Sequence, residues 1–558
     1  MMQLNPLHTT IRTKWLYLFI GMAVMLNLSA LFIPIMGPDG ALYATIAKTM
    51  VVRNDYVQLF VHGADWLDKP HFPFWMAALF FKIFGINTWA YKLSGIVFIL
   101  IGAVYTYLLA KLLYNREIAL WSVLILLTSQ HIILSDNDVR AEPYLTGLII
   151  ASVYHFYIAY TRNGFRQLVL GSLFAACAVM TKGMFALVPI GGAIAGHLMI
   201  TRQWKQLFNW RWLLAAALIM LFILPEIYCL YVQFDAHPEK IVFGQTGVSG
   251  IKFFFWDSQF GRFFNTGPIK GHGDPTFFIH TTLWAFLPWS LILFAAIYHF
   301  IKTGVKNVHQ REWFCLSGAL LTFLLFSASK FQLPHYLNIV FPFFAIITAQ
   351  YLYGLRSAKA VQIIRIMQIV LCVLLIIVIA VLHYYFRPEE FTWHVGLTVL
   401  IWLGVLLVLP GNMPKTDYQQ TAFRTAIIAF IVNLYLNLAF YPSLLHYQAG
   451  SEAAMWINAH NRLNMPVVQN FEQESYPMEF YLRQPLLMIA DDDAHSKLPV
   501  PCFFYGSEPQ VRAMQIKGYK VQKRAAFSRY WITRLNPAFL NHNTRSMQTD
   551  TMLVVILR

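Results

Sequence analysis

Apolar runs long enough to cross a lipid bilayer recur along almost the whole chain, and they constrain its fold more than any other feature. A membrane-spanning helix needs about 20 mostly apolar residues. Hydrophobic residues make up 58% of the 558 residues and charged residues only 12%, against about 25% charged residues in soluble domains. The sequence therefore predicts an α-helical polytopic membrane protein, and it excludes a soluble enzyme, a disordered scaffold and a secreted disulfide-rich protein. Thirteen candidate spans lie at about 15–36, 88–110, 118–134, 144–160, 167–181, 184–200, 212–233, 278–301, 313–328, 336–353, 366–386, 395–410 and 425–443.

Basic residues are distributed unevenly among the segments that join these runs. Alternate joining segments hold 17 Lys and Arg residues and 3 acids, whereas the rest of the chain holds 25 and 23. Lys and Arg accumulate in cytoplasmic loops, so we expect a cytoplasmic N-terminus and read the first run as an uncleaved signal anchor. Topology then explains the net charge of +16, and no nucleic-acid partner is needed. The basic segments are 1–14, 111–117, 161–166, 201–211, 302–312, 354–365 and 411–424.

Three longer segments are expected on the opposite, periplasmic side of the membrane. They are the loops 37–86 and 234–277 and the tail 444–558. Short β-like runs separated by helix-like stretches lie in the tail at 466–471, 501–505 and 552–557. The chain is therefore predicted to have a transmembrane domain at 1–443 and a small α/β domain at 444–558. Its five cysteines lack any CxxC spacing, so neither a disulfide framework nor a zinc ribbon is indicated.

The first outer loop opens with Gly37-Pro38-Asp39-Gly40, directly after the first apolar run. One interpretation is structural, in which Asp39 is the N-cap of an amphipathic helix that follows a Pro-Asp-Gly turn. The other is functional, because a carboxylate at the membrane surface is well placed to meet a lipid headgroup. The sequence leaves both interpretations open.

The same loop contains Asp68-Lys69-Pro70-His71, followed by Phe-Pro-Phe-Trp. Its prolines favour a rigid, extended turn. Lys69 is a natural phosphate ligand that Asp68 could orient. Interfacial anchoring by Lys and Trp is the alternative interpretation.

Two further sets of charges lie where apolar runs meet. Asp138-Val-Arg140-Ala-Glu142 precedes the fourth predicted span, which puts Glu142 near the interface at about the depth of Asp39. The two acids could then form a paired acid site, and solvated turn charge is the alternative. Lys182 separates two apolar runs, where a lone cation is costly unless it meets water or an anion, although a snorkelling lysine is also possible there.

In the loop 234–277, aromatic residues surround Arg262 in the sequence. This pattern fits an interfacial lid that contacts sugar or phosphate. An ordinary structural loop is the alternative interpretation. A divalent metal requirement stays open, because no spacing in the chain is diagnostic. The candidate metal ligands are His237, His272, Asp68 and Asp274.

Taken in order, these motifs resemble those of a known family. They are an acid after the first span, Asp-Lys-Pro-His-Phe-Pro-Phe-Trp at 68–75, Val-Arg-Ala-Glu-Pro at 139–143, Thr-Lys-Gly at 181–183 and Ser-Ala-Ser-Lys-Phe-Gln-Leu-Pro-His-Tyr at 327–336. The chain resembles the protein O-mannosyltransferase-like branch of the GT-C glycosyltransferases. Within that branch it is most similar to the bacterial 4-amino-4-deoxy-L-arabinose lipid A transferases, over roughly residues 15–345.

The resemblance implies an inverting transferase in the bacterial inner membrane. Its donor would be a sugar on a polyprenyl phosphate, its acceptor lipid A, and its site would open toward the periplasm. The resemblance assigns catalysis to Asp39, which would orient or deprotonate the acceptor, and to Glu142, which would assist it and stands where the family more often has Asp. The residues expected to bind the donor phosphate are Lys69, Lys182, Arg262 and Lys330. Those expected to support the substrates are Asp68, His71 (in place of the family's second Pro), Asp138, Arg140, His335 and Tyr336.

The resemblance implies no required cofactor, and we expect a monomer that contacts membrane lipids. Two other functions stay open. One is transfer of a different polyprenyl-linked sugar to protein Ser or Thr or to another glycan. The other is transport of a lipid-linked sugar, but transporters tend to place ionisable groups at the bilayer midplane of repeated halves. Here the acids lie at outer helix ends and no repeat is visible, which favours an enzyme.

Overall fold

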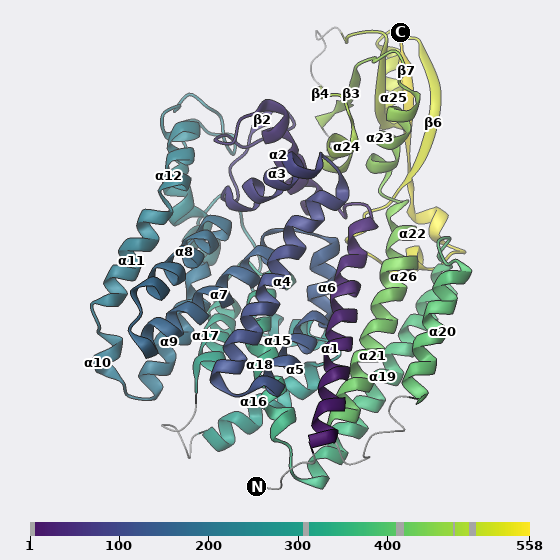
Figure 1. The fold of residues 1–558 in the computed structure, drawn as a ribbon. Coiled ribbons are helices and arrows are strands. Elements are labelled where there is room, and N and C mark those ends of the chain that lie inside the picture. Colours follow the sequence, from purple (N-terminus) through teal and green to yellow (C-terminus); the bar gives the residue numbers. More distant parts are fainter. Residues whose placement is uncertain (1–5, 305–311, 409–417, 472–474, 490–497) are drawn as a thin grey trace.

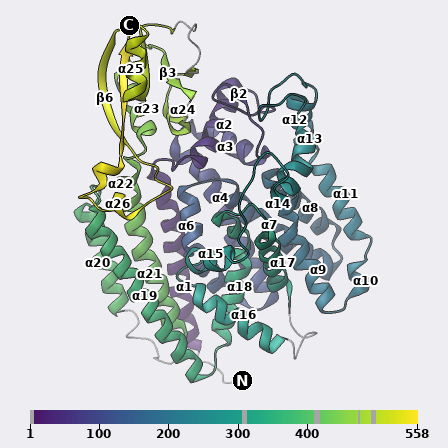
Figure 2. The ribbon, with the colours of Figure 1, turned by 180° about the vertical axis from the view of Figure 1, so that it is seen from behind.

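The computed structural model describes residues 6–304, 312–408, 418–471, 475–489 and 498–558. A large helical bundle makes up most of the molecule, and a β-sheet stands at one end of it (Figure 1). The first helix begins at the opposite end, and the view from behind shows the same separation (Figure 2). The predicted basic segments 302–312 and 411–424 lie partly outside the described residues.

Helices or broken helices overlap every predicted span. The longer helices are α1 (Pro6–Leu28), α4 (Thr88–Leu113), α5 (Arg116–Leu127), α6 (Gln130–Asn137), α7 (Ala141–Arg162), α8 (Phe165–Lys182), α9 (Leu187–Ile200), α11 (Arg211–Phe222), α12 (Leu224–Leu230), α15 (Phe277–Ala285), α16 (Ser290–Gly304), α17 (Phe314–Ala328), α18 (Phe341–Gly354), α19 (Ala358–Phe386), α20 (Trp393–Val408) and α21 (Tyr418–Tyr435). The short helical turns between them are α10 (Trp204–Leu207), α13 (Gly250–Lys252), α14 (Arg262–Phe264) and α22 (Tyr441–Leu445).

Several predicted spans are interrupted. Helices α5 and α6 are bent by 51° at their junction, and α15 and α16 are separated by a turn that contains Pro288, which has no N–H to donate. Among the described residues, six helical stretches are long and apolar enough to cross a membrane, and the bent pair α5 and α6 makes a possible seventh. The protein is a multi-pass membrane protein, and the number of thirteen spans stays a prediction.

The first outer loop folds into α2 (Asp39–Arg53), a small hairpin of β1 (Phe60–Val61) and β2 (Ala64–Asp65), and α3 (Phe72–Phe84). Helix α2 begins at Asp39 itself. The residue before it is Pro38, and no side chain caps the start of the helix. The interpretation of Asp39 as an N-cap is therefore wrong, and its carboxylate is available for other contacts.

The sheet near the C-terminus has the order β4-β3-β5-β7-β6, with the first two pairings parallel and the last two antiparallel. Three of its strands coincide with the predicted β-like runs, whereas β4 and β6 were not predicted. Alternate side chains pack against α23 and α24 on one face and against α25 on the other, so the sheet has a core on both faces. The strands are β3 (Val467–Asn470), β4 (Leu486–Ile489), β5 (Cys502–Ser507), β6 (Val521–Arg529) and β7 (Asp550–Leu557), and the helices are α23 (Ala449–His460), α24 (Tyr476–Tyr481), α25 (Glu508–Ile516) and α26 (Pro537–Leu540).

The C-terminal segment holds α2 at two points. Ahead of the helix, Gln448 accepts a hydrogen bond from the Gly37 amide at 2.8 Å and donates one to the Ile35 carbonyl at 3.0 Å. Within the helix, the Lys48 ammonium donates to three carbonyl oxygens around the end of α24, where helical carbonyls lack partners. Their distances are 2.7 Å for Glu479, 3.0 Å for Phe480 and 2.6 Å for Leu482. Asp39 thus lies between two points of attachment.

Candidate active site

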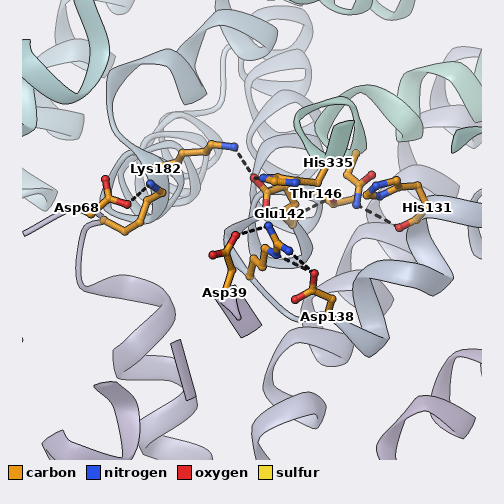
Figure 3. Close-up of polar contacts among 11 residues, drawn as sticks. Asp39, Asp68, His131, Asp138, Glu142, Thr146, Lys182 and His335 are labelled. Carbon is orange, nitrogen blue, oxygen red and sulfur yellow. Dashed lines mark hydrogen bonds and ion pairs between the residues drawn. The ribbon is translucent and has the colours of Figure 1, made fainter. Parts of the chain in front are cut away.

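A cavity with about 620 Å³ of empty space lies where the first outer loop, the turn before α7, the end of α8 and the segment before α18 meet. Figure 3 shows the polar residues around it. Nine of the twelve predicted site residues line it, which are Asp39, Asp68, Lys69, Arg140, Glu142, Lys182, Arg262, His335 and Tyr336. The remaining liners are Leu42, Tyr43, Ile269, Phe331 and Leu333. Residues almost 300 positions apart in the sequence therefore form one site.

Arg140 joins two acids at one side of the cavity. Its guanidinium lies 2.5 Å from Asp39 Oδ2 and 2.5 Å from Asp138 Oδ2 (Figure 3). The Asp39 side chain is 46% exposed, whereas those of Arg140 and Asp138 are 17% and 15% exposed. Gly40 allows this close approach, because a Cβ there would lie 2.8 Å from Asp138 Oδ1. The arrangement holds Asp39 in place but leaves its carboxylate accessible from the cavity.

Glu142 is the most buried acid that lines the cavity, with a side chain only 3% exposed. It forms an ion pair with Lys182, and His335 Nε2 lies 3.7 Å from its Oε1 (Figure 3). The Lys182 ammonium also lies 3.5 Å from the centre of the Tyr336 ring, within the range of a cation–π interaction. A buried carboxylate thus holds this lysine at the cavity wall.

The backbone after α8 brings Lys182 to this position. Gly183 has a φ of +95°, and a side chain there would collide with Gln259, so only glycine fits. Gln259 donates to the Lys182 carbonyl at 3.1 Å and accepts from the Phe185 amide at 3.2 Å. The loop 234–277 therefore supports the Thr-Lys-Gly turn. Sequence reasoning missed Gln259, since its partners lie more than 70 residues away.

A second carboxylate gathers two cations at the other side of the cavity. Asp68 Oδ2 lies 2.7 Å from the Lys69 ammonium, and its Oδ1 forms an ion pair with Arg262. Burial lowers the pKa of Lys69 to about 8, although the negative charges of Glu142 and Asp39 oppose this shift. The Arg262 guanidinium also lies 5.4 Å from the centre of the Phe331 ring. Lys69 and Arg262, which were both predicted to bind the donor phosphate, therefore lie close together although they come from different loops.

An adjoining cavity with about 700 Å³ of empty space shares its charged wall with the first. The shared residues are Asp68, Lys69, Lys182, Arg262, Phe331 and Tyr336. Most of its other liners are apolar, namely Leu145, Phe185, Ala186, Phe263, Phe326 and Ile339, with Ser258, Gln259 and Ser329. The cations thus lie between a polar space and an apolar one.

The predicted acid pair takes a different form in the structure. Asp39 and Glu142 line the same cavity, but each has a cation of its own, Arg140 for Asp39 and Lys182 for Glu142. Opposite charges therefore neutralise the two carboxylates separately. Tyr43, one helical turn after Asp39, also lines the cavity; the spacing of four residues on a helix was the signal that could have placed it there.

Three of the predicted site residues line neither cavity. The first is Asp138, which forms an ion pair with the cavity residue Arg140. His71 is buried, its Nδ1 lies 3.0 Å from Glu226 Oε1 and its Nε2 lies 2.9 Å from the Val57 carbonyl, so it ties the first outer loop to α12. Lys330 is exposed, and its backbone amide donates to the Phe263 carbonyl at 3.1 Å. A charged residue within an apolar run, such as Glu226, was a signal for a buried partner.

The candidate metal ligands do not gather in the described part of the chain. There, no group of three His, Cys, Asp or Glu side chains could hold a metal ion. His237 lies 2.9 Å from Glu239 instead, and Asp274 accepts hydrogen bonds from Thr276.

Comparison with known proteins places this site in a family context. Residues 68–228, which contain the motifs from Asp68 to Lys182, match the family described as dolichyl-phosphate-mannose-protein mannosyltransferase. The chain is 27% identical over 308 residues to the undecaprenyl phosphate-alpha-4-amino-4-deoxy-L-arabinose arabinosyl transferase of Pseudomonas paraeruginosa. It is 25% identical over 334 residues to the protein of the same name from Edwardsiella ictaluri. These matches cover 54% and 58% of this chain, and the chain spans 52% and 57% of those relatives.

A solved structure shares the whole fold. The crystal structure of ArnT from Cupriavidus metallidurans bound to undecaprenyl phosphate matches with a TM-score of 0.73 and 18% identity, over 98% of both chains. The same protein in the apo state matches with a TM-score of 0.71. The predicted fold class and the resemblance to this group of GT-C glycosyltransferases are confirmed.

Proposed function

We propose that this protein, as a relative of these GT-C transferases, is an inner-membrane glycosyltransferase. It moves 4-amino-4-deoxy-L-arabinose from undecaprenyl phosphate to a phosphate group of lipid A, on the periplasmic side of the membrane. The names of the curated relatives support the sugar, and those names together with the undecaprenyl phosphate bound to ArnT support the lipid carrier. The geometry of the cavity supports the reaction type.

One observation carries the proposal. Three cations, Lys69, Lys182 and Arg262, line the wall that the polar cavity shares with the apolar one. A polyprenyl phosphate sugar has the matching polarity, with an apolar chain, an anionic phosphate and a polar sugar in that order. Cations fixed beside the phosphate stabilise the negative charge that it gains as the sugar leaves.

The transfer needs one bond made and one broken. An oxygen of the acceptor phosphate attacks the anomeric carbon of the sugar, and the bond from that carbon to the carrier phosphate breaks, leaving its electron pair on the carrier. Attack opposite the leaving group inverts the anomeric centre. A phosphate acceptor is already anionic near neutral pH, so Asp39 would orient the incoming group rather than remove a proton.

The other residues of the cavity would position these groups. Arg140, held by Asp138, sets the place of Asp39, and Glu142 with His335 sets the place of Lys182. His71 is assigned to the packing of the first outer loop against α12, and Lys330 to the rim of the site. Tyr336 would cover Lys182 with its ring.

The membrane orientation follows from the charge distribution. The basic joining segments support a cytoplasmic N-terminus, so α2, the cavity and the sheet would lie on the periplasmic side, with residues 444–558 as a periplasmic domain. Helix α2, which begins at Asp39, lies at the end of the bundle that carries the sheet (Figure 1), and this position is consistent with that orientation.

The test is mass spectrometry of lipid A from a bacterial host that lacks its own aminoarabinose transferase but makes the donor. Expression of the chain should add one aminopentose, and Lys69→Ala and Lys182→Met should abolish the gain. Asp550→Asn, at the exposed first residue of β7 and far from the cavity in the sequence, is a control that should keep it. Unchanged lipid A with folded protein in the inner membrane would contradict the proposal.

A second candidate function is sugar transfer to a Ser or Thr hydroxyl of a protein, which the description of the matching family supports. A hydroxyl must lose its proton in the reaction, so Asp39 would have to act as a general base. Mass spectrometry of periplasmic glycoproteins from the same host separates the two candidates, because only one of the two product classes should gain the sugar.

A further inference from the structure

The segment that joins strands β6 and β7 leaves the sheet and packs against the helical bundle. We call residues 530–549 the junction segment. In both views it lies over the ends of α19 and α20 that point toward the sheet (Figures 1 and 2). Its Ile532 and Phe539 side chains are buried in one apolar cluster with Phe386, the last residue of α19. The junction segment is therefore fixed at this end of the bundle.

Hydrogen bonds fix the junction segment to the last residues of α19. The Arg545 guanidinium donates to the Phe386 carbonyl at 2.5 Å and lies 4.0 Å from the centre of the Phe386 ring. The His542 amide donates to the Tyr385 carbonyl at 2.9 Å. The last carbonyls of a helix have no partner within the helix, so the junction segment supplies the donors that the end of α19 lacks.

The end of α19 marks the level of the membrane surface. The helix has 29 residues, so it is about 43 Å long, whereas the hydrocarbon core of a bilayer is about 30 Å thick. Only 6% of its apolar stretch is buried inside the protein, as expected for a helix that faces lipid. Tyr384 and Tyr385 are 65% and 46% exposed at its end, and such aromatic residues collect at the interface between membrane and water. The junction segment thus lies at the level of the lipid headgroups.

The junction segment exposes large apolar side chains at this level. Trp531, Leu535 and Met547 are 61%, 40% and 78% exposed. Trp531 directly precedes the buried Ile532, and Met547 comes two residues after Arg545. Consecutive Cα atoms are 3.8 Å apart, so the backbones of Trp531 and Met547 lie within about 8 Å of a residue that is fixed to the bundle. Single exposed apolar side chains are ordinary, but several at one level of a membrane protein indicate a contact surface.

The charge of the junction segment fits the same surroundings. Its sequence contains two Arg residues, one His and no Asp or Glu. Arg534 is exposed, and its guanidinium lies 5.1 Å from the centre of the Trp531 ring. A cation beside an apolar ring suits the membrane surface, where anionic phosphates border hydrocarbon.

We propose that the junction segment is a membrane-contacting surface. The side chains of Trp531, Leu535 and Met547 enter the region of the headgroups and upper acyl chains, and Arg534 binds lipid phosphate. This contact holds the sheet near the C-terminus on the bilayer beside the bundle. The proposal requires only that the bundle spans a bilayer, and it does not depend on the proposed transferase reaction.

Spin labelling of the full-length protein in lipid nanodiscs tests the proposal. The discs contain phosphatidylethanolamine and phosphatidylglycerol, with one protein copy per disc. A nitroxide on Met547→Cys should collide more often with oxygen, which dissolves in lipid, than with a water-soluble nickel chelate. Wild-type protein treated in the same way gives the signal of the native cysteines, which is subtracted.

Ile516→Cys is the matched control. Ile516 is 88% exposed and ends α25, at the end of the sheet away from the bundle (Figure 1). It is as apolar and as exposed as Met547 but lies far from the junction segment, so its label should collide more often with the nickel chelate. If Met547→Cys fails to fold by size-exclusion chromatography, Leu535→Cys takes its place and should behave as predicted for Met547.

Two results would overturn the proposal. The first is a label in the junction segment that the nickel chelate reaches as readily as it reaches the label at Ile516. The second is a label that is protected from nickel only when a disc holds two protein copies. That result would assign the surface to a contact between copies of the chain instead of lipid.

Discussion

Ionisable side chains inside this protein are paired in two contrasting ways. In the candidate active-site cavity, cations that are partly exposed each lie beside an acid, as Lys182 lies beside Glu142 and Lys69 beside Asp68. Outside the liners of that cavity, His71 and Glu226 lie side by side with both side chains 0% exposed.

The difference in exposure separates side chains that a substrate can reach from side chains that only support the fold. In the cavity, the acids would hold the cations in place before a substrate arrives, and an entering phosphate would share cations that are already oriented. Such preorganisation suits catalysis, because little rearrangement is needed during the reaction. The contact between His71 and Glu226 is closed to any ligand and holds the first outer loop against α12.

The largest effect is expected when the buried pair of the cavity is broken. Lys182→Met leaves the carboxylate of Glu142, which is 3% exposed, without its main counter-ion. We expect a loss of about 3 kcal/mol in the free energy of unfolding and a fall of about 10²- to 10³-fold in kcat. Thermal unfolding in detergent and sugar transfer measure the two effects.

The double variant Lys182→Met with Glu142→Gln separates stability from catalysis. With both charges removed, most of the lost stability should return, since no unpaired charge remains buried. Activity should stay low, because the donor phosphate still lacks a cation. Recovery of activity would show that Lys182 only balances Glu142, and the comparison between the two sites would fail.

A smaller loss is expected for Asp39→Asn. General base catalysis contributes about 10²- to 10⁴-fold, but a phosphate acceptor needs no proton removed. We therefore expect about a tenfold fall in transfer to lipid A, with donor binding unchanged. Near-complete loss with folded protein would favour a hydroxyl acceptor instead.

The pH dependence of transfer tests the role of Lys69. Its pKa of about 8 means that the ammonium is charged below pH 8 and neutral above it. Because the phosphate needs the charged form, kcat/KM should fall about tenfold between pH 7 and pH 9, as only about a tenth of the group remains protonated one unit above its pKa. Lys69→Arg should make this fall smaller, since its guanidinium stays charged over the range. An unchanged fall in this variant would assign it to another group.

The smallest effect concerns the attachment of α2 to the C-terminal segment. Lys48→Met removes three hydrogen bonds to carbonyls and loosens the helix that begins at Asp39. We expect a melting temperature lower by about 2 °C and a kcat lower by roughly threefold, with an unchanged KM for the donor. Lys523→Met, on an exposed strand, is the control and should change neither. An altered KM would show that Lys48 takes part in donor binding, and would contradict a purely structural role.

The sequence predicted much of the site because its motifs lie at the ends of apolar runs. Helices of similar length bring such ends to the same level, so Asp39, Glu142 and Lys182 could be expected together. The directions of neighbouring side chains within one motif were harder to predict. Lys69 faces the cavity, whereas His71, two positions later, turns to Glu226 on α12. Nothing in the local sequence distinguishes the two directions.

The sheet near the C-terminus shows a similar limit. The strands β3, β5 and β7 are mostly buried and read as apolar runs, so they were predicted. Strand β6 at the edge of the sheet carries Lys and Arg among small residues, and its exposed side chains resemble a loop. Its pairing with β7 makes it a strand, and that pairing is a long-range contact.

By itself, the sequence determined that this is a membrane protein, which ends of its helices carry charged motifs, and the family of enzymes that it resembles. These properties sum over many residues or belong to short motifs, so they survive without knowledge of packing. The tertiary structure decided which charged side chains form ion pairs, namely Asp39 with Arg140, Glu142 with Lys182 and Asp68 with Arg262. Ion pairing depends on a few ångströms between side chains from different helices, and only the packing of those helices sets such distances.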